Sequence, residues 1–212
     1  MRQRELSDFE CDIAEIYEAG KIRAPIHLRN GNEDQLIKIF EEVKDDDYVF
    51  STWANHLHAL LNGVPPNLVR SENLAGNSIT LHFPEYNFYS SAIVGGICPI
   101  ATGVAWAIKE EFGNRKIDKR VYCFIGDMTL HSGIASESIR YSMGFDLPIT
   151  WVVEDNGKSV GTPTEWTWNC NTQTIADNFH KSLFLKRTNA KLIYYKYETS
   201  YPHSGTGVFV EF

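Results

Sequence analysis

Apolar side chains recur at helical spacing along much of the chain. This spacing predicts four helices, over residues 6–18, 32–43, 54–61 and 97–112. The last of these has the clearest apolar stripe, and Gly113-Asn114 is expected to end it. Residues 67–91 carry many apolar side chains without a period, so we predict an irregular segment there.

The second half of the chain alternates apolar runs of strand length with helical stretches. We predict strands over residues 120–125, 147–154 and 191–197. A predicted helix over 134–143 joins the first two strands into a βαβ unit, whose strands are parallel. Asp127 and Asn156 follow those two strands, so they should be neighbours in space. We therefore expect an α/β fold with a mainly parallel sheet and helices on both faces, formed by residues 1–212 as a single domain.

Composition and charge narrow the class of protein. The chain has 20 basic and 27 acidic residues, a net charge of −7, which does not suit binding to nucleic acid or to an anionic membrane. No apolar run reaches the roughly 18 residues that a membrane helix needs, and the first residues lack the apolar core of a signal peptide. The four cysteines form no close pair. We expect reduced thiols and a cytoplasmic location.

The two predicted strand ends carry metal-binding chemistry. The carboxylate of Asp127 and the amide oxygen of Asn156 are hard donors, which suit Mg²⁺, with Ca²⁺ as the alternative. Gly126 and Gly157 would let the backbone approach a bulky anion closely, and a helix starting near Ser132 would offer its N-terminus to phosphate. These residues predict a metal-bridged diphosphate. The simpler alternative is a loop-capping Asp and a turn Asn.

Gly126-Asp127, a spacer of 28 residues and Asn156 resemble the thiamine diphosphate motif, which begins Gly-Asp-Gly and ends in Asn. Other segments resemble the alpha subunits of 2-oxoacid dehydrogenases in the family's order: residues 20–27, 56–63, 87–105, 126–137, 147–148, 154–157 and 195–204. The stretch Asn87-Phe-Tyr-Ser-Ser-Ala-Ile-Val-Gly-Gly is one of these matches. The chain is thus identified as a shortened, divergent member of this family, the pyrophosphate-binding half of a transketolase-like enzyme.

The resemblance implies thiamine diphosphate and Mg²⁺ as cofactors. It makes the side chains of Asp127 and Asn156 and the backbone carbonyl of Lys158 the metal ligands. The residues implied in cofactor contacts are Ala92, Val94, Gly126, Asp127, Met128, Thr129, Asn156 and Lys158. His203 would lie near the reacting centre and His56 near the substrate channel. Judged from the sequence alone, the simpler interpretation is that His203 lies in a surface turn and His56 in the core.

The implied function is that of an alpha-type subunit which decarboxylates a 2-oxo acid and transfers the acyl or aldehyde unit. A beta-type subunit with a pyrimidine-binding domain would complete the site, in a homodimer or an α₂β₂ heterotetramer. Apolar residues in 67–91 and 201–212 would face that partner, unless they are interior. A split transketolase moving a two-carbon ketol unit is one alternative. A non-catalytic scaffold subunit is another, because Met128 replaces a family Gly and Ala54 a family Arg.

Overall fold

The computed structural model describes residues 1–113 and 115–211, so the predictions that involve Asn114 and Phe212 lie outside the described residues. Contacts between residues divide the chain into two compact units. Unit 1 contains Met1–Asp45, Ser51–Ala92 and the described residues from Tyr197 onward. Unit 2 contains Asp46–Phe50 and, apart from Asn114, Ile93–Lys196. The expectation of a single domain over 1–212 stays a prediction.

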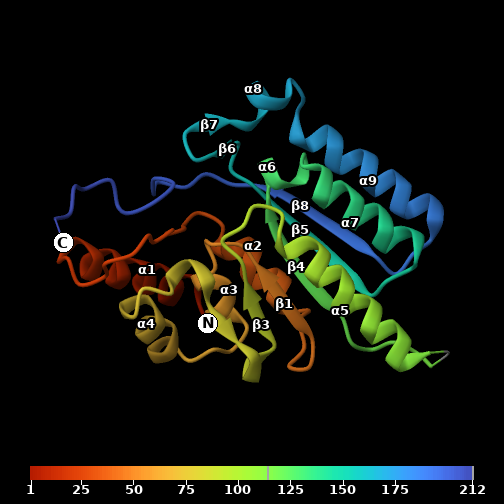
Figure 1. The fold of residues 1–212 in the computed structure, drawn as a ribbon, viewed down its shortest axis with the longest axis horizontal. Coiled ribbons are helices and arrows are strands. Elements are labelled where there is room, and N and C mark those ends of the chain that lie inside the picture. Colours follow the sequence, from red (N-terminus) through yellow and green to blue (C-terminus); the bar gives the residue numbers. More distant parts are fainter. Residues whose placement is uncertain (114, 212) are drawn as a thin grey trace. The chain divides into compact units, whose positions relative to one another are not determined.

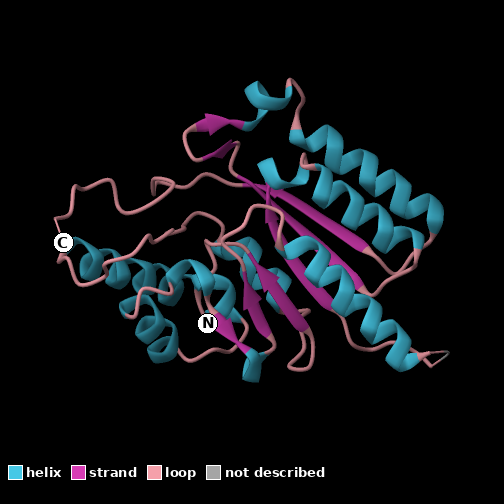
Figure 2. Ribbon diagram, viewed as in Figure 1, coloured by secondary structure: helices cyan, strands magenta, loops and turns pink. Residues whose placement is uncertain are grey.

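Unit 2 is built on parallel strands in the spatial order β1-β4-β5-β8 (Figure 2). Their bounds are Tyr48–Ser51 for β1, Val121–Gly126 for β4, Ile149–Asp155 for β5 and Lys191–Lys196 for β8. Every residue of β5 is buried, as are the first five of β4, which is typical of central strands in a parallel sheet. The prediction of an α/β fold with a mainly parallel sheet is confirmed.

Three long helices lie along one face of this sheet in Figure 1, namely α5 (Ile97–Phe112), α7 (Gly133–Gly144) and α9 (Thr172–Lys186). Helix α7 connects β4 to β5 and α9 connects β5 to β8, so each pair of neighbouring parallel strands is joined by a helical crossover. Shorter elements follow the strand ends: α6 (Asp127–Leu130), β6 (Lys158–Ser159), β7 (Thr162–Pro163) and α8 (Thr164–Trp168). The predicted helices at α5 and α7 are confirmed, whereas α8 and α9 were not predicted.

Unit 1 is mainly helical, with α1 (Gln3–Glu18), α2 (Glu33–Phe40), α3 (His56–Leu61) and α4 (Pro66–Leu74). Two 3₁₀ turns, η1 (Ser78–Thr80) and η2 (Pro84–Tyr86), flank the antiparallel pair β2 (His82–Phe83) and β3 (Phe88–Ser90). The prediction of an irregular segment over 67–91 is therefore wrong. Helix α4 begins at Pro66, whose fixed φ suits the first turn of a helix. Leu81 and Phe88 are fully buried, so much of this apolar content is interior.

The last segment of unit 1 runs beside the residues that follow α1. The N–H of Gly205 donates to the carbonyl of Ile26 at 2.9 Å, and His27 forms a parallel bridge with Gly205. The Nδ1–H of His27 donates to the carbonyl oxygen of His203. Ile26 is fully buried in an apolar cluster, so this pairing fixes the segment against the core of the unit. Within residues 1–113 and 115–211, no helix has both the length and the apolar character that a membrane crossing requires.

The indole of Trp151 ties the central strand β5 to α7. Its side chain is fully buried, and its Nε1–H donates to the Ser142 hydroxyl at 3.1 Å. Trp151→Phe removes this donor and leaves a void, so it should lower the free energy of unfolding by about 1–3 kcal/mol in urea denaturation. Trp166→Phe is the matched control, because Trp166 is 82% exposed. Equal losses in both variants would contradict this description of the core.

Burial lowers the pKa of His27 from an ordinary 6.5 to about 4. The hydrogen bond to the backbone of His203 opposes this change, whereas positive charge on His203, His56 and Arg29 adds to it. Between these pH values the unfolded chain binds a proton that the folded chain does not. The neutral His27 ring therefore makes its full contribution to the free energy of unfolding above pH 6.5. This contribution falls by about 3 kcal/mol as the pH is lowered from 6.5 to 4. His27→Gln should flatten the acid side of the stability curve, measured by urea denaturation at stepped pH. His82→Gln, at an exposed position, should keep the wild-type slope. Parallel curves for His27→Gln and wild type would refute the assignment.

Candidate metal and cofactor site

Two buried carboxylates lie side by side at the carboxyl end of the sheet in unit 2. The register pairs Gly126, the last residue of β4, with Glu154 of β5, so Asp127 follows level with Asp155. The exposed fraction is 2% for Asp127 and 4% for Asp155. Within the described residues, their partners are hydroxyl and backbone N–H groups rather than basic side chains.

This environment makes a negative charge on Asp127 costly. Burial raises the pKa of its carboxyl to about 6, and repulsion from Asp155 adds to the rise, whereas a hydrogen bond from Thr164 opposes it. Removing a carboxylate from water disfavours its charged form, and a neighbouring like charge does the same. A cation bound between the strand ends would relieve both effects.

Thr164 links Asp127 to the turn that carries the other two predicted ligands. Its hydroxyl donates to Oδ2 of Asp127, and its backbone N–H donates to the carbonyl of Gly157 at 3.0 Å. The turn itself is closed by the N–H of Lys158, which donates to Oδ1 of Asn156 at 3.3 Å. Helix α6 also contacts strand β6. The three predicted ligand residues are thus grouped around one buried threonine.

Tyrosines on the edge strand β8 hold the acids at the end of β5. The Tyr194 hydroxyl donates to Oδ2 of Asp155, and the Tyr195 hydroxyl donates to Oε1 of Glu154 at 2.6 Å. Burial, together with the negative charge of Asp155, raises the pKa of Tyr194 well above its usual range, so it stays a donor. Sequence reasoning missed Asp155, Thr164 and Tyr194. The one available signal was the acid next to the predicted ligand at position 156.

Helix α6 carries the remaining motif residues. A Cβ built on Gly126 would meet no atom within 4 Å, so there is open space beside the strand end. Thr129 is buried, and its carbonyl accepts from the hydroxyl of Ser132, the N-cap of α7, at 2.6 Å. The sulfur of Met128 accepts a hydrogen bond from the indole N–H of Trp168 at 3.0 Å. Met128 is therefore held by α8.

Val94 lies just before α5, in a segment that packs through Gly95 against Ile134 at the start of α7. It is 50% exposed and precedes Gly95, whose φ is +72°. A Cβ on Gly95 would lie 2.4 Å from Cγ2 of Ile134, so only glycine allows this close approach. Ala92 is half-buried and belongs to unit 1.

The two predicted catalytic histidines both belong to unit 1. His56 is 1% exposed; its Nδ1 lies 2.9 Å from a Glu10 carboxylate oxygen and its Nε2 lies 2.8 Å from the Ser78 hydroxyl. Both ring nitrogens are thus engaged, and the described role of His56 is a buried link between helices. His203 is half-buried, and its ring centroid lies 4.6 Å from that of His27. Burial lowers the pKa of His203, so the neutral ring is favoured. The catalytic roles of both histidines stay predictions.

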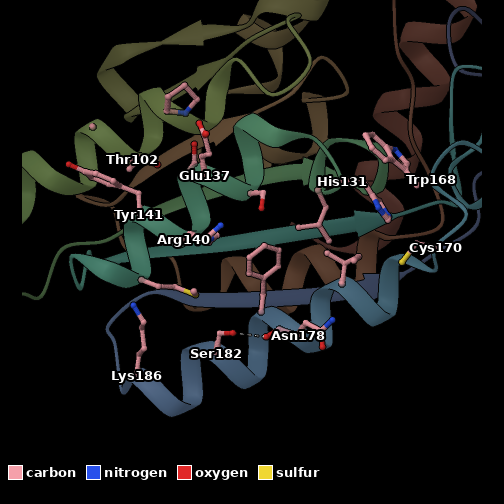
Figure 3. A pocket seen from close by; sticks show the side chains of 18 of the residues that line it. Thr102, His131, Glu137, Arg140, Tyr141, Trp168, Cys170, Asn178, Ser182 and Lys186 are labelled. Carbon is pink, nitrogen blue, oxygen red and sulfur yellow. Dashed lines mark hydrogen bonds between the residues drawn. The ribbon is translucent and has the colours of Figure 1, made fainter.

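A cavity of about 1400 Å³ lies among α5, α7 and α9 (Figure 3). Trp106, Tyr141 and Phe179 give it apolar walls. Figure 3 shows His131 and Trp168 together at one end, where the two rings stack 5.6 Å apart at 13°. His131 directly follows α6 and Trp168 bonds Met128 of α6, so the cavity adjoins the motif residues.

The donor set fits a divalent cation with a diphosphate. No group of three or more His, Cys, Asp or Glu side chains suited to a metal occurs among the residues that the structure describes. The predicted set does not need one, because Mg²⁺ commonly takes one or two carboxylates and leaves its other positions to phosphate and water. The uncompensated acids and the open space at Gly126 both favour a bound cation.

Comparisons with known proteins identify the family of this chain. The family "Dehydrogenase E1 component" matches residues 1–178. The alpha subunit of the pyruvate dehydrogenase E1 component of Porphyra purpurea is 31% identical over 170 residues, which are 73% of this chain and 48% of that protein. Subunit alpha-3 of the chloroplastic enzyme of Arabidopsis thaliana is 32% identical over 72% of this chain and 39% of its own length.

The alpha subunit of acetoin:2,6-dichlorophenolindophenol oxidoreductase of Bacillus subtilis is 27% identical over 82% of this chain and 53% of its own. The chain therefore spans about half the length of these relatives or less. Transketolase from Leishmania mexicana shares the fold, with a TM-score of 0.60 and 14% identity over 94% of this chain and 37% of that one. The family match covers most of the sequence, and the chain belongs to the dehydrogenase E1 component family.

Proposed function

We propose that this chain is the alpha-type subunit of a two-component thiamine diphosphate enzyme that decarboxylates a 2-oxo acid and transfers the acyl or aldehyde unit. The observation that carries the proposal is the buried carboxylate of Asp127, tied through Thr164 to the turn at Asn156–Lys158. The names of the relatives support the same activity, since two are alpha subunits of pyruvate dehydrogenase E1 components.

In this proposal the side chains of Asp127 and Asn156 and the carbonyl of Lys158 would hold Mg²⁺, which would leave its other positions to phosphate and water. The same oxygen ligands would also suit Ca²⁺. Met128 and Thr129 would contact the diphosphate, for which the open space beside Gly126 leaves room. The ion would offset the negative charge of the two acids and of the phosphates at the same time. Because both need the same cation, metal binding and cofactor binding are coupled.

When bound, thiamine diphosphate supplies the electron sink that takes the bonding electrons left as CO₂ departs from a 2-oxo acid. The chain's own part is to fix the diphosphate end and to keep water from the reacting end. Ala92 and Val94 support the ring of the cofactor. His203 offers a neutral imidazole near the reacting centre, since burial lowers its pKa. His56 would lie near the substrate channel, with its ring held in place by its bonds to Glu10 and Ser78.

A beta-type subunit with a pyrimidine-binding domain completes the site in an α₂β₂ heterotetramer, and the complex is cytoplasmic. Large apolar side chains that face solvent support a partner: Phe184 and Leu185 of α9 are 83% and 79% exposed, and Trp166 of α8 is 82% exposed. A homodimer of this chain would cover the same surface.

Asp127→Asn tests the metal site. The variant keeps an oxygen that accepts from Thr164 but loses the charge, so Mg²⁺-dependent binding of thiamine diphosphate should weaken by at least roughly 100-fold, since loss of even an outer-shell partner costs about 10–100-fold. Isothermal titration at several Mg²⁺ concentrations measures this. Asp177→Asn, an exposed carboxylate on α9, should bind as wild type does. Unchanged binding by Asp127→Asn would remove the basis of the proposal.

The partner requirement is tested by activity. The purified chain should show no decarboxylation of pyruvate or branched 2-oxo acids, and co-expression with a beta-type subunit should restore it, because the pyrimidine end needs the second domain. Full decarboxylase activity of the chain alone contradicts this prediction. Ketol transfer from ketose phosphates instead of decarboxylation indicates the split transketolase. A complex without metal-dependent cofactor binding indicates a scaffold subunit.

A further inference from the structure

We infer that Thr164 is a positioning residue of the metal site, which holds the Asp127 carboxylate and the turn at Asn156–Lys158 in their ligating arrangement. This inference rests on the proposed function. Thr164 was absent from the residues that the sequence indicated, and it contacts two of the segments from which the ligands come.

Both bonds of Thr164 are fixed by its place in the fold. Its hydroxyl donates to Oδ2 of Asp127, and its backbone N–H donates to the carbonyl of Gly157 at 3.0 Å. Thr164 is only 1% exposed, so water does not compete for either hydrogen bond. Pro163 immediately before it pairs with Lys158 in the β6–β7 hairpin, and this pairing restrains the backbone on the other side of the turn.

The hydroxyl acts on Asp127 in two ways. It removes the rotational freedom of a carboxylate that a metal ion would otherwise have to order on binding. It also donates to the charged form of a buried acid that lies beside Asp155, and the charged form is the one that binds a cation. A side chain of the same shape without the hydroxyl would lose both effects and keep the packing.

Helix α8 contacts α6 at a second point. The indole N–H of Trp168, the last residue of α8, donates to the sulfur of Met128, the residue after Asp127. Thr164 and Trp168 therefore bind adjacent residues of α6 from the two ends of α8. This second contact keeps α8 in place when the hydroxyl at 164 is removed, and it makes the fluorescence of Trp168 sensitive to events at Met128.

The test compares Thr164→Val with Thr164→Ser. Val keeps the β-branched shape and lacks the donor, whereas Ser keeps the donor. With thiamine diphosphate at saturation, the Mg²⁺ concentration for half-maximal binding should rise about 10–100-fold in Thr164→Val and stay within about threefold of wild type in Thr164→Ser. Titration calorimetry and tryptophan fluorescence measure this without any activity assay. Excess Mg²⁺ should restore the wild-type plateau in Thr164→Val, which a folding defect would not allow.

Thr167→Val is the matched control, because the hydroxyl of this exposed threonine of α8 donates to the carbonyl of Pro163 within its own turn and, among the described residues, to no predicted ligand. Its Mg²⁺ titration should match that of wild type. If thermal melting shows Thr164→Val to be unfolded, Thr164→Ala replaces it with the same expected shift. Wild-type Mg²⁺ dependence in the variant without the hydroxyl overturns the inference alone. Absence of Mg²⁺-dependent binding in the wild-type chain overturns the proposed function and this inference together.

Discussion

A pair of buried carboxylates at the ends of two adjacent parallel strands is the constraint on which the candidate site depends. Asp127 and Asp155 are almost wholly removed from water, and the charge of Asp155 adds to the effect of burial in raising the pKa of Asp127. The fold satisfies them with donors from separate elements, Thr164 of α8 and Tyr194 of β8. These hydroxyl groups lower the free-energy cost of burying the two carboxylates, but being neutral they do not cancel the negative charge. A cation bound at this site would therefore be stabilised by the two acids, as the metal ion of a metal-bridged diphosphate must be.

The same need for partners organises the polar groups of unit 1. His56 joins Glu10 to Ser78 inside the unit, and His27 holds the carbonyl of His203 in the last segment. These buried histidine, glutamate and serine side chains are hydrogen-bonded to one another, because an unpaired polar group inside the unit would lower its stability. The histidines that the family resemblance indicates are thus also structural residues, and their substitution would change both stability and any catalytic role.

The sequence predicted the centre of unit 2 well and its periphery poorly. Helix α5 and the βαβ unit of β4, α7 and β5 have strong apolar periods, and Asp127 and Asn156 follow from them by the geometry of parallel strands. Helix α9 was missed because its apolar side chains do not form one stripe: Phe184 and Leu185 are exposed. Thr164 was missed because its contact with Asp127 depends on the β6–β7 hairpin, whose two-residue strands have no periodic signature. Family resemblance supplied the roles of Lys158, His56 and His203, which no pattern in the chain alone could give.

The most direct measurement of the central claim is a crystal structure of the chain with thiamine diphosphate and Mn²⁺, in which the anomalous signal locates the ion. Mn²⁺ takes the same oxygen ligands as Mg²⁺ and scatters strongly enough to be placed without bias. The account predicts one ion bound by the side chains of Asp127 and Asn156 and the carbonyl of Lys158, with the diphosphate also among its ligands. An ion elsewhere, or a diphosphate bound without Asp127, would contradict it.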